Sequence, residues 1–246
     1  MRVTISGNGP DLVLLPGWGM TAQVWTEVAA LLAPQLRVHC VDWSADTVGA
    51  LSTLDALADA VAAITAPRAT VCGWSLGGQL ALHWALRKPA QVARFILIST
   101  TPCFVRSAGW NHGMEPAVFD AFAQNLAHDV AGTLQRFIVL QAHGDTAERT
   151  VIRRLRACVA LPDAAPLAAG LQLLKQTDLR ADLAQIGQPA LLLHGERDSV
   201  VPAGAGDYLQ RTLPNAGLAT IAGAAHAPFI AQPRAVAQRI AEFCHG

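Results

Sequence analysis

Short apolar runs alternate with amphipathic segments along most of this chain. Residues 11–15 form a nearly continuous apolar run, as in a buried strand, whereas residues 22–32 repeat their apolar positions at helical spacing. Strands that alternate with helices predict a mostly parallel sheet covered by helices on both faces. The expected strands are 3–6, 11–15, 36–41, 69–72, 94–99, 190–194 and 218–222, and the expected helices of these units are 22–32, 54–64, 78–86, 205–213 and 233–243.

The alternation stops in the middle of the chain, where the sequence shows helical spacing and no strand pattern. Strand–helix units resume at residue 190, so the chain returns to complete the same sheet. We therefore expect one α/β core, residues 1–100 and 187–246, with an all-helical cap, residues 101–186, inserted in it. The helices expected in this cap are 116–126, 133–141, 147–158 and 166–175.

A Gly-x-Ser-x-Gly pentapeptide, Gly73-Trp74-Ser75-Leu76-Gly77, stands between an expected strand and an expected helix. This is the context of a nucleophile elbow, a tight turn in which the serine backbone is strained and the flanking glycines avoid side-chain collisions. The turn projects the serine hydroxyl above the sheet edge, beside a helix N-terminus that favours developing negative charge. Ser75 is therefore the predicted nucleophile.

A serine nucleophile needs a base and an acid that orients the base. In strand–elbow–helix enzymes of this kind, the three residues follow the chain order Ser, Asp or Glu, His. Asp198 follows the strand 190–194 and His226 follows the last strand, so both lie at carboxyl ends of strands. They are the predicted acid and base, with Glu196 as the nearest alternative acid. The remaining histidines are interpreted as core or surface residues.

A tetrahedral intermediate needs backbone N–H groups aimed at its oxyanion. One donor is expected from Leu76, directly after the nucleophile, and the second from the loop that follows the strand 11–15. Pro16 has no N–H group, so that second donor is expected to be Trp18, which also lines the pocket. Acyl transfer of this kind requires no metal and no organic cofactor.

Composition narrows the remaining possibilities. Among 246 residues, 52% are hydrophobic and the formal net charge is zero, so bulk charge favours neither nucleic acid nor an anionic membrane. The five cysteines are scattered and lack C-x-x-C spacing, which indicates free thiols in a reducing compartment and no zinc site. No segment has the pattern of a signal peptide or membrane span. We expect a cytoplasmic monomer.

Several of these stretches together resemble the α/β-hydrolase superfamily over the whole chain. More narrowly, the chain resembles the pimeloyl-[acyl-carrier protein] methyl ester esterases of biotin synthesis, through residues 12–20, 73–78, 101–104, 136–141, 170–175 and 224–229. The resemblance implies hydrolysis of a methyl ester on an acyl chain carried by an acidic carrier protein, giving free pimeloyl-acyl-carrier protein and methanol. It also implies that Phe137 and Gln141 face the substrate beside Trp18.

The sequence departs from the family pattern at two places. Pro16 stands where many members have histidine, and residues 42–46 replace a usual Asp-x-Pro-Gly-x-Gly turn. The first change removes no backbone donor, whereas the second affects one rim of the pocket.

Basic residues gather on one expected cap helix. Arg149, Arg153 and Arg156 recur at i, i+4 and i+7 and so share a helix face, Arg154 flanks them, and Arg136 begins the pocket motif. Given the resemblance, we interpret Arg136, Arg149, Arg153 and Arg156 as a docking face for the acidic carrier protein. The alternative is an ordinary solvated helix face.

Two other functions stay open at this point. The chain could be a general carboxylesterase or a C–C-bond hydrolase acting on small free substrates. It could also be a catalytically inactive hydrolase-fold binding module, although such a module has no need of Ser75, Asp198 and His226 together.

Overall fold

The computed structural model describes residues 1–42, 53–159 and 163–246. Its centre is a seven-stranded sheet in the order β1-β3-β2-β4-β5-β6-β7, in which only β1 runs antiparallel to its neighbour. The mostly parallel sheet predicted from the alternation is therefore confirmed. The strands are β1 (Arg2–Ser6), β2 (Asp11–Leu15), β3 (Arg37–Asp42), β4 (Ala69–Trp74), β5 (Val92–Ile98), β6 (Ala190–Gly195) and β7 (Ala216–Ile221).

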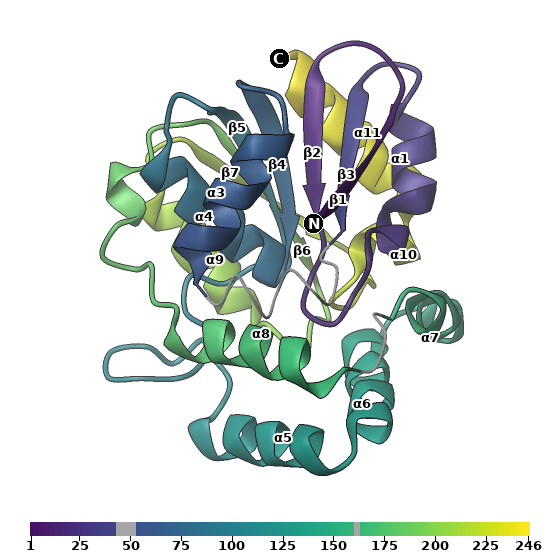
Figure 1. The fold of residues 1–246 in the computed structure, drawn as a ribbon, viewed down its shortest axis with the longest axis vertical. Helices are drawn as coiled ribbons and strands as arrows, with labels where there is room; N and C mark the ends of the chain where they lie inside the picture. The colour runs from purple at the N-terminus through teal and green to yellow at the C-terminus, as the bar shows by residue number, and fades with distance from the viewer. Residues whose placement is uncertain (43–52, 160–162) are drawn as a thin grey trace.

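Helices cover both faces of this sheet (Figure 1). Because side chains of a strand point alternately to opposite faces, Val13 and Leu15 pack into one core and Leu12 and Leu14 into the other. The first core includes α3 (Leu54–Ile64), α4 (Leu76–Arg87) and α9 (Ala203–Thr212), and the second includes α1 (Thr26–Leu32) and α11 (Pro233–His245).

In the described part of the chain, four α-helices follow β5 and precede β6, and they lie together across one end of the sheet (Figure 1). Loops at the carboxyl ends of three strands contact this helical block. The Thr21 amide donates to the carbonyl of Cys158, and the His226 amide donates to the carbonyl of Gln141. The backbones of Cys103 and Asp178 pair in an isolated antiparallel β-bridge. The helices are α5 (Pro116–His128), α6 (Val130–Ala142), α7 (Glu148–Ala157) and α8 (Ala164–Gln176).

Local geometry differs from the sequence prediction at three places. The helix expected at 22–32 begins as a 3₁₀ turn, η1 (Ala22–Trp25), capped by the Thr21 hydroxyl, before α1 continues it. Two short elements, the 3₁₀ turn η2 (Leu183–Gln185) and the helix α10 (Pro228–Ala231), were not expected, because three or four residues are too few to show helical periodicity. The changed turn at 42–46 lies, except for Asp42, outside the described residues.

Candidate active site

Ser75 occupies a strained turn between β4 and α4. Its backbone has φ 54° and ψ −115°, a positive φ that non-glycine residues rarely adopt. The flanking glycines are required by close backbone packing, because a Cβ atom on Gly73 would lie 2.2 Å from the carbonyl oxygen of Gly77. A Cβ atom on Gly77 would lie 2.4 Å from the carbonyl oxygen of Leu15. The turn therefore has the geometry expected of a nucleophile elbow.

Asp198 and His226 are hydrogen bonded to each other. The distance between Nδ1 of His226 and Oδ2 of Asp198 is 2.8 Å, and the Asp198 side chain is fully buried. The other carboxylate oxygen, Oδ1, accepts hydrogen bonds from the amides of Val200 and Val201, each at 2.9 Å. Burial alone would raise the pKa of Asp198, but the charge and hydrogen bond of His226, with His194 and the Val201 amide, lower it below its ordinary value.

Since Asp198 engages Nδ1, the other ring nitrogen of His226 is the one available for chemistry. Nε2 is buried and has no hydrogen-bond partner among the residues described. The His226 backbone is held beside the elbow, because the indole Nε1 of Trp74 donates to its carbonyl oxygen at 2.8 Å. The two rings are 5.6 Å apart between centroids. Tertiary structure thus joins Asp198 to His226 and holds the His226 backbone against Trp74, the residue directly before Ser75.

The predicted oxyanion donors belong to the elbow itself and to a loop packed against it. The close packing of Gly77 against the carbonyl oxygens of Leu15 and Pro16 sets the loop that carries Trp18 against the first turn of α4. The amides of Trp18 and Leu76 donate to no backbone acceptor within the described part of the chain. The Trp18 side chain is committed elsewhere, since its Nε1 donates to the carbonyl of Leu167 at 2.8 Å. Only its backbone N–H is therefore left for an oxyanion.

Phe137 and Gln141, the predicted substrate residues, both lie on α6 and are both buried. The Phe137 ring packs edge-on against Trp18 with 5.3 Å between centroids. The backbone carbonyl of Gln141 accepts a hydrogen bond from the His226 amide at 3.0 Å. The side-chain Nε2 of Gln141 is buried and finds no acceptor among the described residues. A buried amide without an acceptor fits a role in binding a polar ligand atom.

Glu196, the alternative acid, has a different partner. Its Oε2 accepts from the amide of Gly223 at 2.8 Å, whereas the carboxylate bound to His226 is that of Asp198. His194, interpreted as structural, lies with Nε2 3.7 Å from Oδ2 of Asp198 and 2.9 Å from the carbonyl oxygen of Val201. His194 therefore steadies the loop that carries Asp198, a role that its position four residues earlier could have indicated.

The arginines of the helical block divide into two groups. Arg149 and Arg153 are exposed on α7 and make no hydrogen bond or ion pair with another described residue. The other two predicted docking residues have partners, because Arg156 donates to Gln135 and Arg136 pairs with Asp129 at 3.5 Å. Arg154, which flanks them, forms an ion pair with Glu27.

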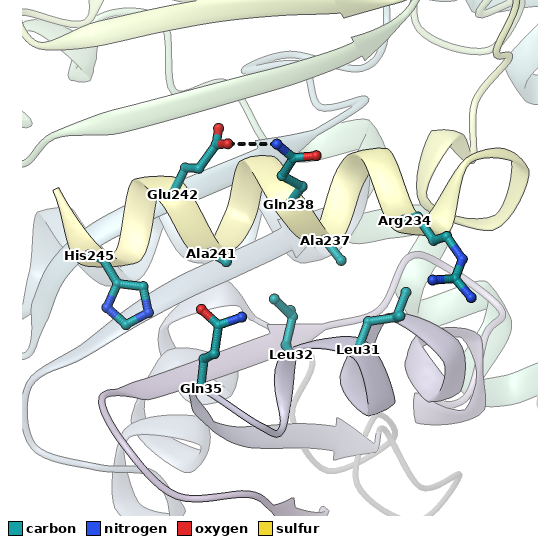
Figure 2. Close-up of a pocket in the computed structure, with 9 residues that line it drawn as sticks. All are labelled: Leu31, Leu32, Gln35, Arg234, Ala237, Gln238, Ala241, Glu242 and His245. Carbon is teal, nitrogen blue, oxygen red and sulfur yellow. Dashed lines mark hydrogen bonds between the residues drawn. The ribbon is translucent and has the colours of Figure 1, made fainter.

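Two surface grooves lie away from this site. The larger, about 510 Å³, runs between α1 and α11, where Leu31 and Leu32 face Ala237 and Ala241 (Figure 2). The second, about 240 Å³, lies beside the paired side chains of Asp55 and His83. Neither groove is lined by Ser75, Asp198 or His226.

No group of three or more potential metal ligands occurs within residues 1–42, 53–159 and 163–246. In the same ranges, no helix is long and apolar enough to cross a membrane.

Comparison with known proteins gives consistent results. The model of the alpha/beta hydrolase family matches residues 12–239. A protein of Nitrosomonas europaea named pimeloyl-[acyl-carrier protein] methyl ester esterase is 43% identical, with 95% of each chain covered. A protein of the same name from Aromatoleum aromaticum is 42% identical over 97% of this chain and 100% of its own. Among solved structures, an esterase from Exiguobacterium antarcticum matches with a TM-score of 0.88 and 20% identity, over 99% of this chain and 95% of its own. At that identity the match shows a shared fold.

Proposed function

This chain belongs to the alpha/beta hydrolase family, and from that premise we propose that it is a serine carboxylesterase that hydrolyses the methyl ester of pimeloyl-acyl-carrier protein in biotin biosynthesis. The observation that carries the esterase activity is the buried Asp198–His226 pair beside the strained turn of Ser75. The substrate is supported by the names of relatives at 43% and 42% identity over nearly the full chain.

The proposed reaction proceeds in two acyl-transfer steps. Nε2 of His226 takes the Ser75 proton, and the serine oxygen attacks the ester carbonyl. The backbone N–H groups of Leu76 and Trp18 stabilise the oxyanion, and protonated His226 then gives its proton to the departing methoxide, which leaves as methanol. Water attacks the acyl-enzyme in the same way and releases the free acid. Asp198 holds His226 in the tautomer that presents an unprotonated Nε2.

We assign the acyl chain to the space between the core and the helical block. In this proposal residues 1–100 and 187–246 form the catalytic core and residues 101–186 form a cap over it. Phe137 packs against Trp18, and Gln141, one turn further along α6, contacts His226, which supports their role in substrate binding. The apolar rings suit methylene groups, and the unpartnered amide of Gln141 suits a carbonyl oxygen.

Docking of the carrier protein is assigned to the exposed face of α7 and the middle of α6, where Arg136 lies. Arg149 and Arg153 supply charges that no described residue neutralises, so they are available to an acidic partner. Arg136 and Arg156 extend this basic face, although Asp129 and Gln135 already engage them. We therefore expect Arg149 and Arg153 to contribute more to docking than Arg136 and Arg156.

The decisive test compares two substrates. The purified protein should hydrolyse pimeloyl-acyl-carrier protein methyl ester and a small p-nitrophenyl ester, and Ser75→Ala should abolish both activities while the protein stays folded by circular dichroism. Biotin-free growth of an esterase-deletion strain that carries this gene would support the pathway assignment. Retained turnover in Ser75→Ala would refute the assignment of Ser75 as the nucleophile. If the wild type hydrolyses the p-nitrophenyl ester but not the carrier-bound ester, the protein is a small-substrate esterase and the proposed substrate is wrong.

Charge reversal tests the docking face. Arg149→Glu with Arg153→Glu should lower kcat/KM for the carrier-bound ester at least tenfold, because attraction becomes repulsion at two sites, and should spare the p-nitrophenyl ester. Arg239→Glu is the matched control, since Arg239 is an exposed arginine on α11, away from the helical block. An equal loss on both substrates, or no loss on either, would contradict docking at α7.

The cellular setting is also proposed. All five cysteines are unpaired, which agrees with the reducing environment of the cytoplasm. We propose a cytoplasmic monomer, to be tested by fractionation and by light scattering.

A further inference from the structure

A buried carboxylate in the helical block contacts the loop that carries His226. Asp145 lies in the turn between α6 and α7 with only 6% of its surface exposed. Its Oδ2 accepts a hydrogen bond from the amide of Ala225 at 2.8 Å, and its Oδ1 accepts one from the amide of Ala147 at 2.7 Å. One carboxylate therefore joins the cap turn to the residue directly before His226.

Two further bonds join the same segments. The His226 amide donates to the carbonyl of Gln141 at 3.0 Å, and the Thr146 amide donates to the carbonyl of Gly223 at 2.9 Å. Residues 223–226 are thus bound along their length to residues 141–146. Asp145 is the member of this set that acts through its side chain, so it is the one that a substitution can remove.

The sequence of the His226 loop explains why such support matters. Gly223, Ala224 and Ala225 carry no large side chain to fix the backbone by packing, and Gly223 adopts a positive φ of 70°. A loop of this composition is held mainly by its backbone hydrogen bonds. Small displacements of a catalytic base are costly, since a misplacement of about 1 Å can reduce the rate about a hundredfold.

We propose that Asp145 is a positioning residue for His226, which fixes the loop of the catalytic base to the cap through the Ala225 amide. The inference rests on the proposed function, in which His226 is that base. It requires a carboxylate in particular. An ionised Asp accepts with both oxygens, whereas an Asn turns an N–H₂ group toward one of the two backbone N–H donors. Asp145→Asn therefore keeps the side-chain shape and leaves one buried amide without an acceptor.

The test measures the rate per competent active site. A fluorophosphonate probe counts the sites that can be acylated, and p-nitrophenyl ester turnover then gives kcat for each counted site. For Asp145→Asn we expect the number of sites to stay near that of the wild type, kcat per site to fall about ten- to a hundredfold, and KM to change less than about threefold. A merely structural role would instead reduce the number of sites and leave kcat per site unchanged, which would overturn the proposal.

The matched control is Asp163→Asn. Asp163 is another cap aspartate that accepts from a backbone amide two residues ahead, Ala165, at 3.1 Å, and it makes no contact with the loops of Asp198 or His226 among the described residues. Its kcat per site should match that of the wild type. Equal losses in the two variants would overturn the assignment to Asp145. Failure of the wild type itself to label or turn over would refute the proposed function, a separate result.

A measurement on the unmodified protein keeps the proposal testable if Asp145→Asn does not fold. Amide hydrogen exchange should show the Ala225 and His226 amides protected as strongly as those of β6, since both donate to the cap. Exchange of these amides at the rate of an exposed loop would overturn the proposal.

Discussion

The sharpest consequence of the site geometry concerns Asp198→Asn. In the wild type, Oδ1 of Asp198 accepts from the amides of Val200 and Val201 and Oδ2 faces Nδ1 of His226. The two backbone N–H groups can be satisfied only by an oxygen, so the Asn side chain must place its oxygen there and its N–H₂ group toward His226. Nδ1 then has to accept a hydrogen bond, and the ring proton moves to Nε2. An imidazole in that tautomer cannot take the Ser75 proton.

The size of the effect follows from this change of tautomer. Loss of the orienting carboxylate in a serine triad lowers kcat about 10⁴-fold, which corresponds to about 5 kcal/mol of transition-state stabilisation. The Asp198 side chain is 0% exposed, so solvent does not screen its pairing with His226 and the full effect is expected. KM should change little, because Asp198 is buried behind the imidazole and does not line the substrate space.

The assay is steady-state hydrolysis of a p-nitrophenyl ester by the wild type, Asp198→Asn and Glu196→Gln. Glu196 is the matched control, because it lies two residues earlier in the same loop and contacts the amide of Gly223, whereas His226 is bound by Asp198. We expect Glu196→Gln to lose less than about tenfold. The assignment of Asp198 as the acid would be refuted if Asp198→Asn kept more than about a tenth of the wild-type kcat. It would also be refuted if Glu196→Gln lost more activity than Asp198→Asn.

Three further predictions follow from burial and packing. Gly73→Ala should lower the free energy of unfolding by about 1–3 kcal/mol and lower Tm, because the added Cβ atom would lie 2.2 Å from the backbone oxygen of Gly77. Its control, Gly217→Ala, has no atom within 4 Å of the added Cβ atom and should leave Tm within about 2 °C of the wild type. Burial raises the pKa of Cys40 to about 11, so iodoacetamide should alkylate it slowly at pH 7.5 and faster as pH rises toward 11; rapid labelling at pH 7.5 would contradict this. The pKa of Asp198 is lower in the folded state than the unfolded value of about 3.9, so the ionised carboxylate stabilises the fold above that pH. This stabilisation is lost as pH falls through the folded pKa. The difference in unfolding free energy between wild type and Asp198→Asn should therefore hold from neutral pH to about pH 4 and shrink below it.

Local patterns determine the strands and helices. Short apolar runs in strands and 3.6-residue repeats in helices are properties of neighbouring residues, so the strands from β1 to β7 and the helices from α5 to α8 can be expected from the sequence. The nucleophile elbow is local in the same way, since its two glycines are needed within five residues of chain. The elements that were missed, α10 and η2, are single turns too short to repeat a pattern.

Residue order could indicate Ser75, Asp198 and His226 as candidates, but not which atoms meet. Whether Asp198 or Glu196 binds His226 depends on how the loop after β6 turns, and only the fold shows that Glu196 reaches Gly223 instead. The spacing of the arginines predicts a shared face on α7, yet it gives no sign that Gln135, on another helix, engages Arg156. Hydrogen bonds between distant segments have no sequence period.

The sequence by itself determined the α/β alternation, the elbow and the three reactive residue types, because each depends on side chains within a few positions of one another. The tertiary structure decided which polar groups are paired and which are left without partners. It buries Asp198 against His226, commits the Trp18 indole to Leu167, and places Asp145 under the loop of residue 226. These contacts join segments from 80 to 149 residues apart, or join the loop after β6 to the loop after β7, so they exist only once the sheet and the helical block have packed together.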